Sequence, residues 1–164
     1  MNQISTYILE HFENSKFSIL ERLHINKYTG NHYHNYNYHP KTRVELKELI
    51  DQLIKKRGND ADLNDIDTSK ITDMHYLFVN SEFNGNISEW DVSNVKDMSY
   101  MFQHSSFNGD ISNWDVSNVK DMASMFAYSE FNGDISKWDV SNVVDIRHMF
   151  DKSPLEENPP KWYY

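Results

Sequence analysis

The residues of this 164-residue chain that are best suited to chemistry are a short histidine tract and three columns of carboxylates. The tract holds His32, His34 and His39 among tyrosines and asparagines, and imidazole nitrogens of this kind ligate zinc or nickel. Their spacing matches no compact zinc motif, and the chain has no cysteine to supply thiolates. We interpret the tract as a polar, aromatic loop beside a helix and predict no metal site. Metal binding through His32 and His34 is the alternative hypothesis.

The carboxylates recur every 24 residues along the C-terminal part of the chain. The three columns are Asp67, Asp91, Asp115 and Asp139; Asp73, Asp97, Asp121 and Asp145; and Asn86, Asp110 and Asp134. Like charges stacked about 5 Å apart repel each other by roughly 1 kcal/mol or more unless each is hydrogen-bonded locally. We therefore interpret each aspartate as the cap of a turn or helix in its own unit. Calcium between neighbouring units is the alternative hypothesis, although the glycine-rich calcium nonapeptide is absent.

No arrangement of residues predicts catalysis. Neither a Ser-His-Asp set, nor paired carboxylates, nor a phosphate-binding loop stands out in the sequence. The Asn-Gly pairs that begin at Asn84, Asn108 and Asn132 are typical of turns rather than of a P-loop. We therefore predict a protein that is not an enzyme, with no catalytic residues and no cofactor.

The carboxylate columns and the Asn-Gly pairs belong to a repeat of 24 residues. Its sequence motif W-D-V-S-N-V begins at Trp90, Trp114 and Trp138. Four copies span about residues 66–162, and the last is degenerate, as expected of a capping repeat whose outer face meets water. Tryptophan, phenylalanine and methionine occupy fixed columns in the copies. Because one unit cannot bury its apolar face alone, these columns predict a stacked core rather than a platform for sugars or bases.

Each unit is expected to contain one short helix and one short extended segment. Val95, Met98 and Met101 recur at helical spacing, and Asn94 is the expected cap of that helix. Residues 107–114 place apolar residues around an Asn-Gly pair and predict a short strand or extended turn. Strands stacked from unit to unit would lie about 4.8 Å apart. The pattern therefore predicts an α/β repeat.

Residues 1–64 are predicted to form an N-terminal helical cap segment, and residues 65–164 a solenoid of four repeats. Apolar residues at helical spacing occur near the start of the chain, within residues 4–12. Thr42 and Glu45 form a capping box that opens a second helix, and Gly58 ends it. The apolar side of this helix, expected to face a core, is Val44, Leu46, Leu49, Ile50, Leu53 and Ile54. We expect the segment to cover the first repeat's open edge, which would otherwise pair with other chains.

Charge is distributed unevenly along the chain, whose net charge is −9. Residues 1–60 hold nine basic and seven acidic residues, whereas residues 61–164 hold seven basic and eighteen acidic residues, a balance of −11. An acidic surface repels nucleic acid, whose binders need a basic footprint. It attracts a basic protein surface and speeds association with it. We therefore predict a basic protein partner and no direct binding of nucleic acid; the oligomeric state stays open.

Targeting signals and membrane spans are not evident. No apolar run is long enough to cross a membrane, and no basic segment followed by an apolar one marks a signal peptide. Without cysteine there are no disulfides and no lipid-attachment box. We expect a cytoplasmic protein, or an extracellular one if a leader was removed.

The strings W-D-V-S-N-V-x-D-M-x-x-M-F and F-N-G-(D/N)-I-S resemble the BspA-like leucine-rich-repeat family of bacterial surface proteins and mycoplasma lipoproteins. The resemblance extends from about Asp65 to the C-terminus. It implies a short right-handed solenoid of the leucine-rich-repeat type, with a parallel sheet on one face and the N-terminal segment as its cap. It also implies protein-binding or surface-adhesion roles and no catalytic residues. Many members of that family are exported with a signal or lipid anchor, and this chain shows neither.

Candidate binding residues are expected at positions where the copies differ, because the residues that are identical in every copy are needed to build the repeat. The partner-binding residues predicted in this way are Glu82, Glu89, Gln103, His104, Asn113, Tyr128, Glu130 and Lys137. Tyr128 and His104 are the best anchors, because aromatic residues often dominate interface energies. Neutral drift at exposed positions is the alternative explanation of the same variation.

Three functional hypotheses follow from these features. The first is a non-enzymatic protein-binding module that acts through an acidic repeat surface. The second is an intracellular inhibitor, of the kind carried by phages, that blocks a nucleic-acid-handling enzyme such as a host-defence nuclease. The third is a fragment of a surface adhesin.

Overall fold

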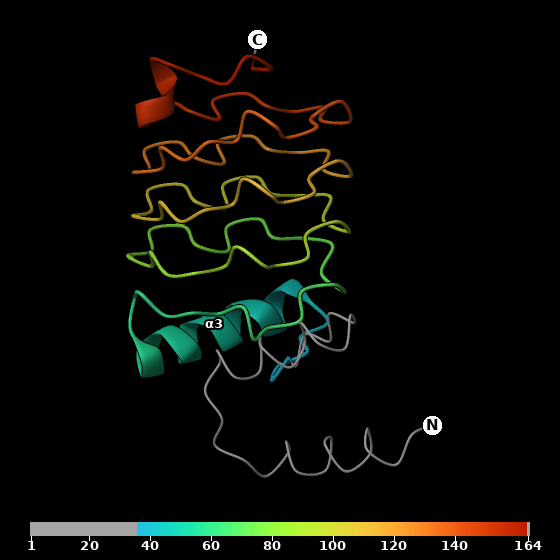
Figure 1. Cartoon of the computed structure of the whole chain (residues 1–164), viewed down its shortest axis with the longest axis vertical. Coiled ribbons are helices and arrows are strands. Elements are labelled where there is room, and N and C mark those ends of the chain that lie inside the picture. The colour runs from blue at the N-terminus through green and yellow to red at the C-terminus, as the bar shows by residue number, and fades with distance from the viewer. Residues whose placement is uncertain (1–35, 164) are drawn as a thin grey trace, which may run out of the picture. The chain divides into compact units, whose positions relative to one another are not determined.

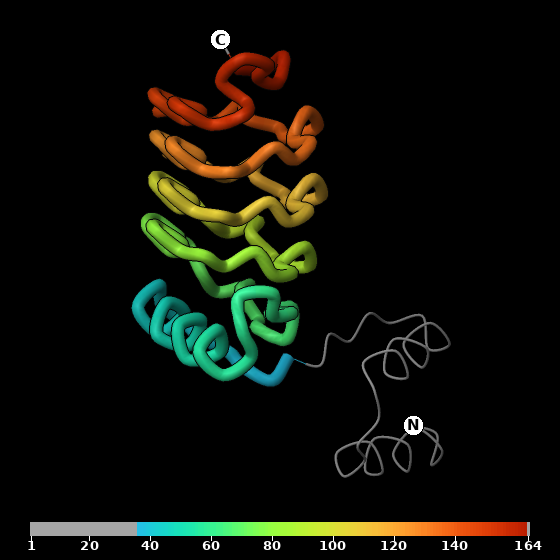
Figure 2. Tube along the Cα trace, turned by 90° about the vertical axis from the view of Figure 1, so that its left-hand side faces the viewer, coloured from blue at the N-terminus to red at the C-terminus, as the bar shows by residue number. Residues whose placement is uncertain are grey.

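The computed structural model describes residues 36–163 of this chain (Figures 1 and 2). They contain one α-helix, α3 (Arg43–Arg57), one short 3-10 helix, η1 (Pro154–Glu156), and no strand. Between these helices the chain winds through successive coils stacked one above another, and α3 lies against the first of them (Figures 1 and 2). Coils 1 to 4 correspond to residues 66–89, 90–113, 114–137 and 138–161.

The predicted α/β class, a right-handed leucine-rich-repeat solenoid with a parallel sheet, is wrong. Within residues 36–163 the β pairing consists of five isolated parallel bridges. Residues 95–102 form consecutive turns rather than a helix, because the amide of Met101 donates to the carbonyl of Met98 only three residues before. Asn94 caps no helix: its side-chain amide donates across to the carbonyl of Ser69 in the preceding coil, at 2.9 Å.

A ladder of turns replaces the sheet. We call it the turn ladder; it consists of residues 73–80, 97–104, 121–128 and 145–152. Every second amide in it donates to the next coil. From coil 1 to coil 2 the donors are Met74, Tyr76, Phe78 and Asn80, and the acceptors are the carbonyls of Asp97, Ser99, Met101 and Gln103, at 2.8–3.1 Å.

The reason for this one-sided pattern is the left-handed backbone of two residues in each coil. In coil 1 these are Tyr76, with φ of 57°, and Asn80, with φ of 55°. The intervening amides of His75, Leu77 and Val79 donate within their own coil. A regular strand would instead point its amides alternately to both sides. The turns thus satisfy all the backbone donors of residues 74–80 without forming a sheet.

The predicted core columns are confirmed. The rings of Phe78, Phe102, Phe126 and Phe150 stack nearly parallel from coil to coil, with neighbouring centroids 5.4–6.0 Å apart. Each repeat tryptophan donates its indole N–H to a carbonyl 27 residues earlier; Trp114, for example, donates to Ile87 at 3.2 Å. The methionines at the ladder positions are fully buried between these columns. Identical side chains therefore fill the interior at the repeat period.

Helix α3 begins and ends where the sequence predicts. The Thr42 hydroxyl accepts the Glu45 amide at 3.2 Å, and the amide of Gly58, whose φ is 95°, donates to Ile54. Leu46, Ile50 and Leu53 are buried in the same hydrophobic cluster as the coils, with Leu49 and Ile54 partly buried. Val44, predicted to face the core, is 56% exposed.

The stacking register begins before the first predicted repeat. The amides of Asn84 and Asn86 donate to the carbonyls of Asn59 and Ala61, at 2.9 and 3.0 Å. The indole of Trp90 donates to Leu63 in the same manner as the later tryptophans. The link after α3 therefore forms a partial coil beneath coil 1. The predicted boundary between residues 64 and 65 stays a prediction, and residues 1–35, with the apolar spacing of residues 4–12, lie outside the described part.

A candidate protein-binding surface on the turn ladder

The left-handed residues of the turn ladder form two columns. The first column is Tyr76, Tyr100, Ser124 and His148, and the second is Asn80, His104, Tyr128 and Lys152, with φ between 53° and 61°. A left-handed backbone costs an L-residue roughly 1–2 kcal/mol, and asparagine tolerates it best. In coil 1, buried Met74 and Phe78 alternate with exposed Tyr76 and Asn80, so the left-handed residues of this coil face away from the core. The other members of the two columns are exposed or half-buried, except Ser124, which is buried.

Aromatic rings stack along both columns. Tyr76 and Tyr100 lie with centroids 4.7 Å apart and planes 6° apart, and His104 and Tyr128 lie 4.7 Å apart at 15°. Tyr76 is 41% exposed and Tyr128 is 52% exposed. Such pairs contribute about 0.5–1.5 kcal/mol, which offsets part of the backbone cost. The surface therefore presents ordered aromatic groups to solvent.

The structure brings together two of the predicted partner-binding residues, His104 and Tyr128. Of the others, Gln103 is half-buried. The remaining five are exposed and distributed over the surface: Glu82, Glu89, Asn113, Glu130 and Lys137. Glu82 accepts a hydrogen bond from the side chain of Asn59, at 3.3 Å. A role in binding stays a prediction for all eight.

The first left-handed column, with Tyr76 and Tyr100, was not predicted to bind. The signal was present, because this position reads Tyr, Tyr, Ser and His across the four copies. Because a helix was expected over these residues, the tyrosines were interpreted as part of its ordinary solvent-facing side.

Each member of the carboxylate columns accepts a hydrogen bond from the backbone amide two residues later, as predicted. Asp91 binds the amide of Ser93 at 3.0 Å and Asp97 that of Ser99 at 2.9 Å, and the equivalent residues repeat this at 2.9–3.1 Å. Asn86 makes the same bond to Ser88 with its amide oxygen. These local bonds explain how carboxylates can stack at the repeat spacing.

The same bonds lower the pKa of several carboxyls. The amide of Ser112 lowers the pKa of Asp110, and Ser136 lowers that of Asp134. The guanidinium of Arg147, which pairs with Asp145 through two nitrogens at 3.0 and 2.5 Å, lowers the pKa of that carboxyl to about 2. A carboxyl whose pKa is lower in the folded chain adds stability above the ordinary value of 3.8, and this stability is lost as the pH falls.

The double variant Asp110→Asn, Asp134→Asn should therefore resist acid better than the wild type. Asparagine keeps the acceptor oxygen, as Asn86 does at the equivalent position, but does not titrate. We expect the Tm of the variant at pH 7 to be slightly below that of the wild type, because the charged acceptors are lost, and its fall between pH 5 and pH 2 to be smaller. Thermal melts followed by circular dichroism measure this. Parallel Tm curves for the two proteins across that range would contradict the assignment.

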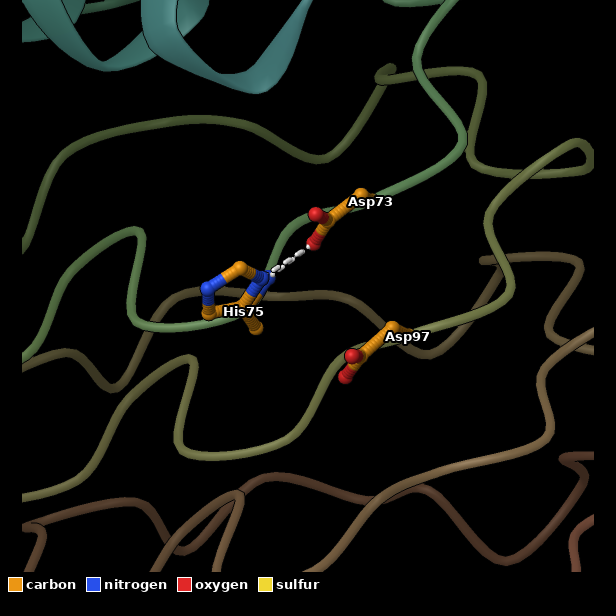
Figure 3. A group of neighbouring side chains, drawn as sticks. All are labelled: Asp73, His75 and Asp97. Atoms are coloured by element: carbon orange, nitrogen blue, oxygen red, sulfur yellow. Dashed lines mark hydrogen bonds and ion pairs between the residues drawn. The ribbon is translucent and has the colours of Figure 1, made fainter.

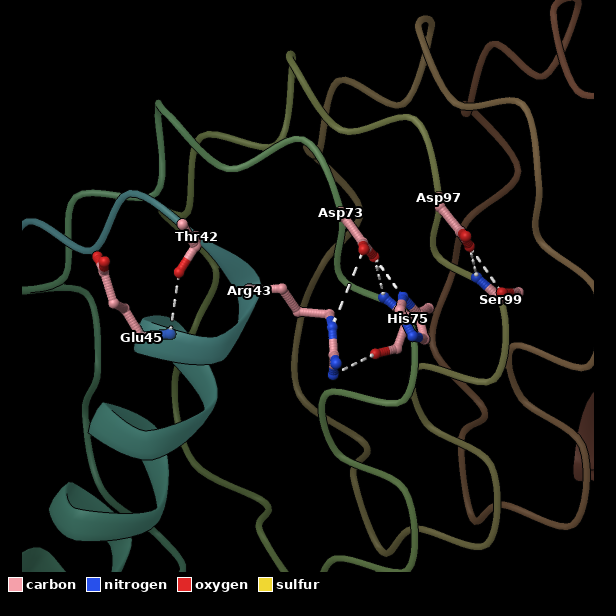
Figure 4. Close-up of polar contacts among 7 residues, drawn as sticks. All are labelled: Thr42, Arg43, Glu45, Asp73, His75, Asp97 and Ser99. Atoms are coloured by element: carbon pink, nitrogen blue, oxygen red, sulfur yellow. Dashed lines mark hydrogen bonds and ion pairs between the residues drawn. The ribbon is translucent and has the colours of Figure 1, made fainter.

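Asp73, His75 and Asp97 form the one cluster of possible metal ligands found in the described part of the chain, with ligand atoms within 4.8 Å of one another (Figure 3). The Nδ1 atom of His75 lies 2.6 Å from Asp73 Oδ1. Arg43 reaches over from α3, with Nε 3.9 Å from Asp73 Oδ2 and one terminal nitrogen 3.4 Å from the His75 carbonyl (Figure 4). The guanidinium already supplies positive charge here, so the geometry favours an internal ion-pair cluster over a metal centre.

The predicted histidine tract is described only at its end. Nδ1 of His39 lies 3.1 Å from Asp67 Oδ2, and both groups belong to the surface. His32 and His34 lie outside the described residues. Within residues 36–163, no helix is both long and apolar enough to cross a membrane, as predicted.

Comparison with known proteins identifies a family but no characterised relative. A family model described as "Mycoplasma protein of unknown function, DUF285" matches residues 45–162. No curated protein and no solved structure matches the chain. The matched residues include most of α3 together with all four coils.

Proposed function

The chain belongs to the DUF285 family of mycoplasma proteins, and we propose that it is a non-enzymatic module that binds a protein through its acidic repeat surface. The binding face would be the turn ladder and the variable positions beside it. A rigid stack that presents different side chains at equivalent positions of each coil is suited to recognising an extended surface.

The observation that carries this proposal is the His104–Tyr128 pair. Both residues hold a strained left-handed backbone at an exposed position, with φ of 54° and 57°. Asn80 shows that a residue suited to this conformation fits the same column. Strain retained at the surface in bulky aromatic residues favours a role in binding, since such residues supply most of the energy at interfaces.

The charge of the coils supports a basic partner. Residues 61–164 carry a balance of −11, and their aspartates are held in fixed positions by local hydrogen bonds. Ordered charges of one sign speed association with the opposite charge, and salt screens them over about 10 Å at 0.1 M. Binding should therefore weaken as the salt concentration rises.

We further propose that the repeats are of the BspA-like type, with the turn ladder in place of a sheet. The 24-residue period and the mycoplasma family match support this kinship. Absence of catalysis and a cytoplasmic location remain part of the proposal.

The test is affinity capture from a mycoplasma lysate with the full chain and two matched variants. Tyr128→Asn installs the residue found at Asn80, and the double variant Glu82→Ser, Glu130→Ser installs the residue found at Ser106. We expect one protein to be retained in stoichiometric amount by the wild type. Tyr128→Asn should lose it, and the double variant should retain less and with a weaker dependence on salt.

Stability provides the control for both variants. Tyr128→Asn removes a stacking contact but relieves backbone strain, so its free energy of unfolding should lie within about 1 kcal/mol of the wild type. Equal retention of the captured protein by wild type and both variants would overturn the proposal. A catalytic activity that survives in Tyr128→Asn would also do so.

A further inference from the structure

The Asn-Gly pairs of coils 1, 2 and 3 have nearly the same sequence but are held differently. They begin at Asn84, Asn108 and Asn132, and the second and third share the string F-N-G-D-I-S. The side-chain oxygen of Asn84 accepts the amide of Asn108, and that of Asn108 accepts the amide of Asn132, both at 2.8 Å. A ladder of asparagine side chains therefore links the coils, and each of these two side chains is held by the coil that follows it.

Asn132 is the last member of this ladder, and its side chain has no hydrogen-bond partner among residues 36–163. The equivalent residue of coil 4 is Glu156, whose amide donates instead to the carbonyl of Ser153, at 3.1 Å. That bond belongs to η1, which interrupts the repeat in the last coil. The 3-10 helix therefore removes the donor that would otherwise hold the Asn132 side chain.

The glycine of the third pair is also the least closely packed. A methyl group at Gly85 would overlap the carbonyl oxygen of Ala61, and one at Gly109 would lie 3.1 Å from the carbonyl oxygen of Gly85. At Gly133 the three nearest atoms all belong to the side chain of Phe131. The backbone of the preceding coil therefore restrains the first two pairs more tightly than the third.

A hollow of about 380 Å³ adjoins the third pair. It is lined by residues 132–136 of coil 3 and by Leu155 and residues 158–161 of coil 4. All three asparagines of the ladder are exposed, so access of water does not distinguish them. The hollow distinguishes Asn132 because it leaves this pair room to change conformation.

From these differences we propose that Asn132 is a site of spontaneous deamidation, whereas Asn84 and Asn108 are protected by the coils that follow them. The backbone nitrogen of Gly133 attacks the side-chain carbon Cγ of Asn132 and gives up its proton, and the side-chain nitrogen leaves as ammonia. Water then opens the resulting succinimide ring at one of its two carbonyls, which yields aspartate or isoaspartate. This modification does not depend on the proposed function.

The hydrogen bonds of the ladder set the expected difference in rate. The carboxamide must rotate toward the next backbone nitrogen, so the reaction proceeds from a local opening of the chain. At Asn108 this opening breaks the bond from the Asn132 amide, whereas at Asn132 no such bond has to break. One hydrogen bond changes an equilibrium by roughly two- to tenfold, so Asn132 should react faster than Asn108 by about this factor.

The reaction would change the surface of coil 3. Both products add a negative charge between the predicted binding residues Glu130 and Lys137. Isoaspartate also inserts a methylene group into the backbone beside coil 4. Deamidation would therefore alter the charge and the shape of the candidate binding surface as the protein ages.

The test follows the wild-type full chain during incubation in mildly alkaline buffer at body temperature, both folded and unfolded in guanidinium chloride. Peptide mass spectrometry after rapid proteolysis measures the conversion of amide to acid at each asparagine, and chromatography separates isoaspartate from aspartate. In the folded chain we expect Asn132 to convert roughly two- to tenfold faster than Asn108, and Asn84 to convert no faster than Asn108. In the unfolded chain Asn108 and Asn132 should convert at the same rate, because their neighbours are the same.

Two variants assign the reaction to this site. Asn132→Ser keeps the backbone amide that holds Asn108, so the more acidic species that accumulates in the wild type on anion exchange should be lost while Asn108 stays protected. Gly133→Ala places a methyl group beside the attacking nitrogen and should slow conversion at Asn132 without changing the rate at Asn108.

Three results would overturn the inference. The first is a rate at Asn132 in the folded chain that equals or falls below the rate at Asn108. The second is an equally large difference between the two sites in the unfolded chain, since flanking residues would then be the cause. The third is an Asn132 that does not convert in the folded chain under conditions in which the unfolded chain reacts.

Discussion

Phe102→Ala is expected to lower the free energy of unfolding by about 3–5 kcal/mol, because it removes a fully buried ring and leaves a cavity. Phe102 stacks on Phe78 at 5.4 Å, on Phe126 at 5.6 Å and on Phe107 at 4.5 Å. It therefore joins coil 2 to the coils on both sides. Denaturation by urea, followed by tryptophan fluorescence, measures the change.

The location of Phe102 in the stack sharpens this prediction. Each coil contacts only its neighbours, so a cavity in coil 2 weakens two interfaces at once. Tyr100→Ser is the matched control, since it truncates an aromatic residue of the same coil to the residue found at Ser124. This control substitution should lower the free energy of unfolding by no more than about 1.5 kcal/mol, which is the contribution of one surface stacking pair. Equal losses for the two variants would show that the phenylalanine column does not carry the core.

Gly85→Ala is expected to lower the free energy of unfolding by about 3 kcal/mol, whereas Gly133→Ala should lower it by about 1 kcal/mol. A methyl group at Gly85 would overlap the carbonyl oxygen of Ala61, a backbone atom of the partial coil below, and would lie 2.6 Å from the Phe83 ring. At Gly133 the three nearest atoms all belong to the Phe131 side chain, the closest at 2.7 Å. A side chain can shift, but the Ala61 carbonyl is held by the Asn86 amide.

The comparison of these glycines tests how the first coil rests on the segment after α3. Both occupy the same column, so their turn propensities are equal and cancel. A difference of about 2 kcal/mol between the variants in urea denaturation would identify the close backbone approach as the cause. Equal values would mean that the residues around Ala61 do not stack as a partial coil.

Side-chain burial was predictable from the sequence because it follows from the 24-residue repeat of apolar residues alone. Every 24 residues, Trp114 and Phe102 have equivalents that are buried with them, and any stacked arrangement of the copies produces this result. The ends of α3 were predictable for a local reason, since Thr42 and Gly58 satisfy the helix termini within a few residues. The bonds of the aspartates to amides two residues later are local in the same sense.

Backbone conformation was not predictable, because apolar spacing reports which side chains are buried and not the direction of the peptide planes. Val95, Met98 and Met101 have a helical spacing, yet two successive turns bury them equally well. The left-handed positions are occupied by Tyr, Ser, Asn, His and Lys, so the residue type at a position does not predict a left-handed backbone. The glycines of the Asn-Gly pairs, which looked like turn residues, have no left-handed φ, and the close approach of neighbouring chain accounts for Gly85.

By itself, the sequence determined the repeat, its core and the start and end of α3. The tertiary structure alone decided that amides of the turn ladder pair between coils, because those bonds join residues 23 positions apart. The same stacking sets the ring of Tyr128 on His104 and the ring of Tyr100 on Tyr76, although no local sequence motif links these groups. Distances between coils, rather than spacing along the chain, therefore define the candidate binding surface.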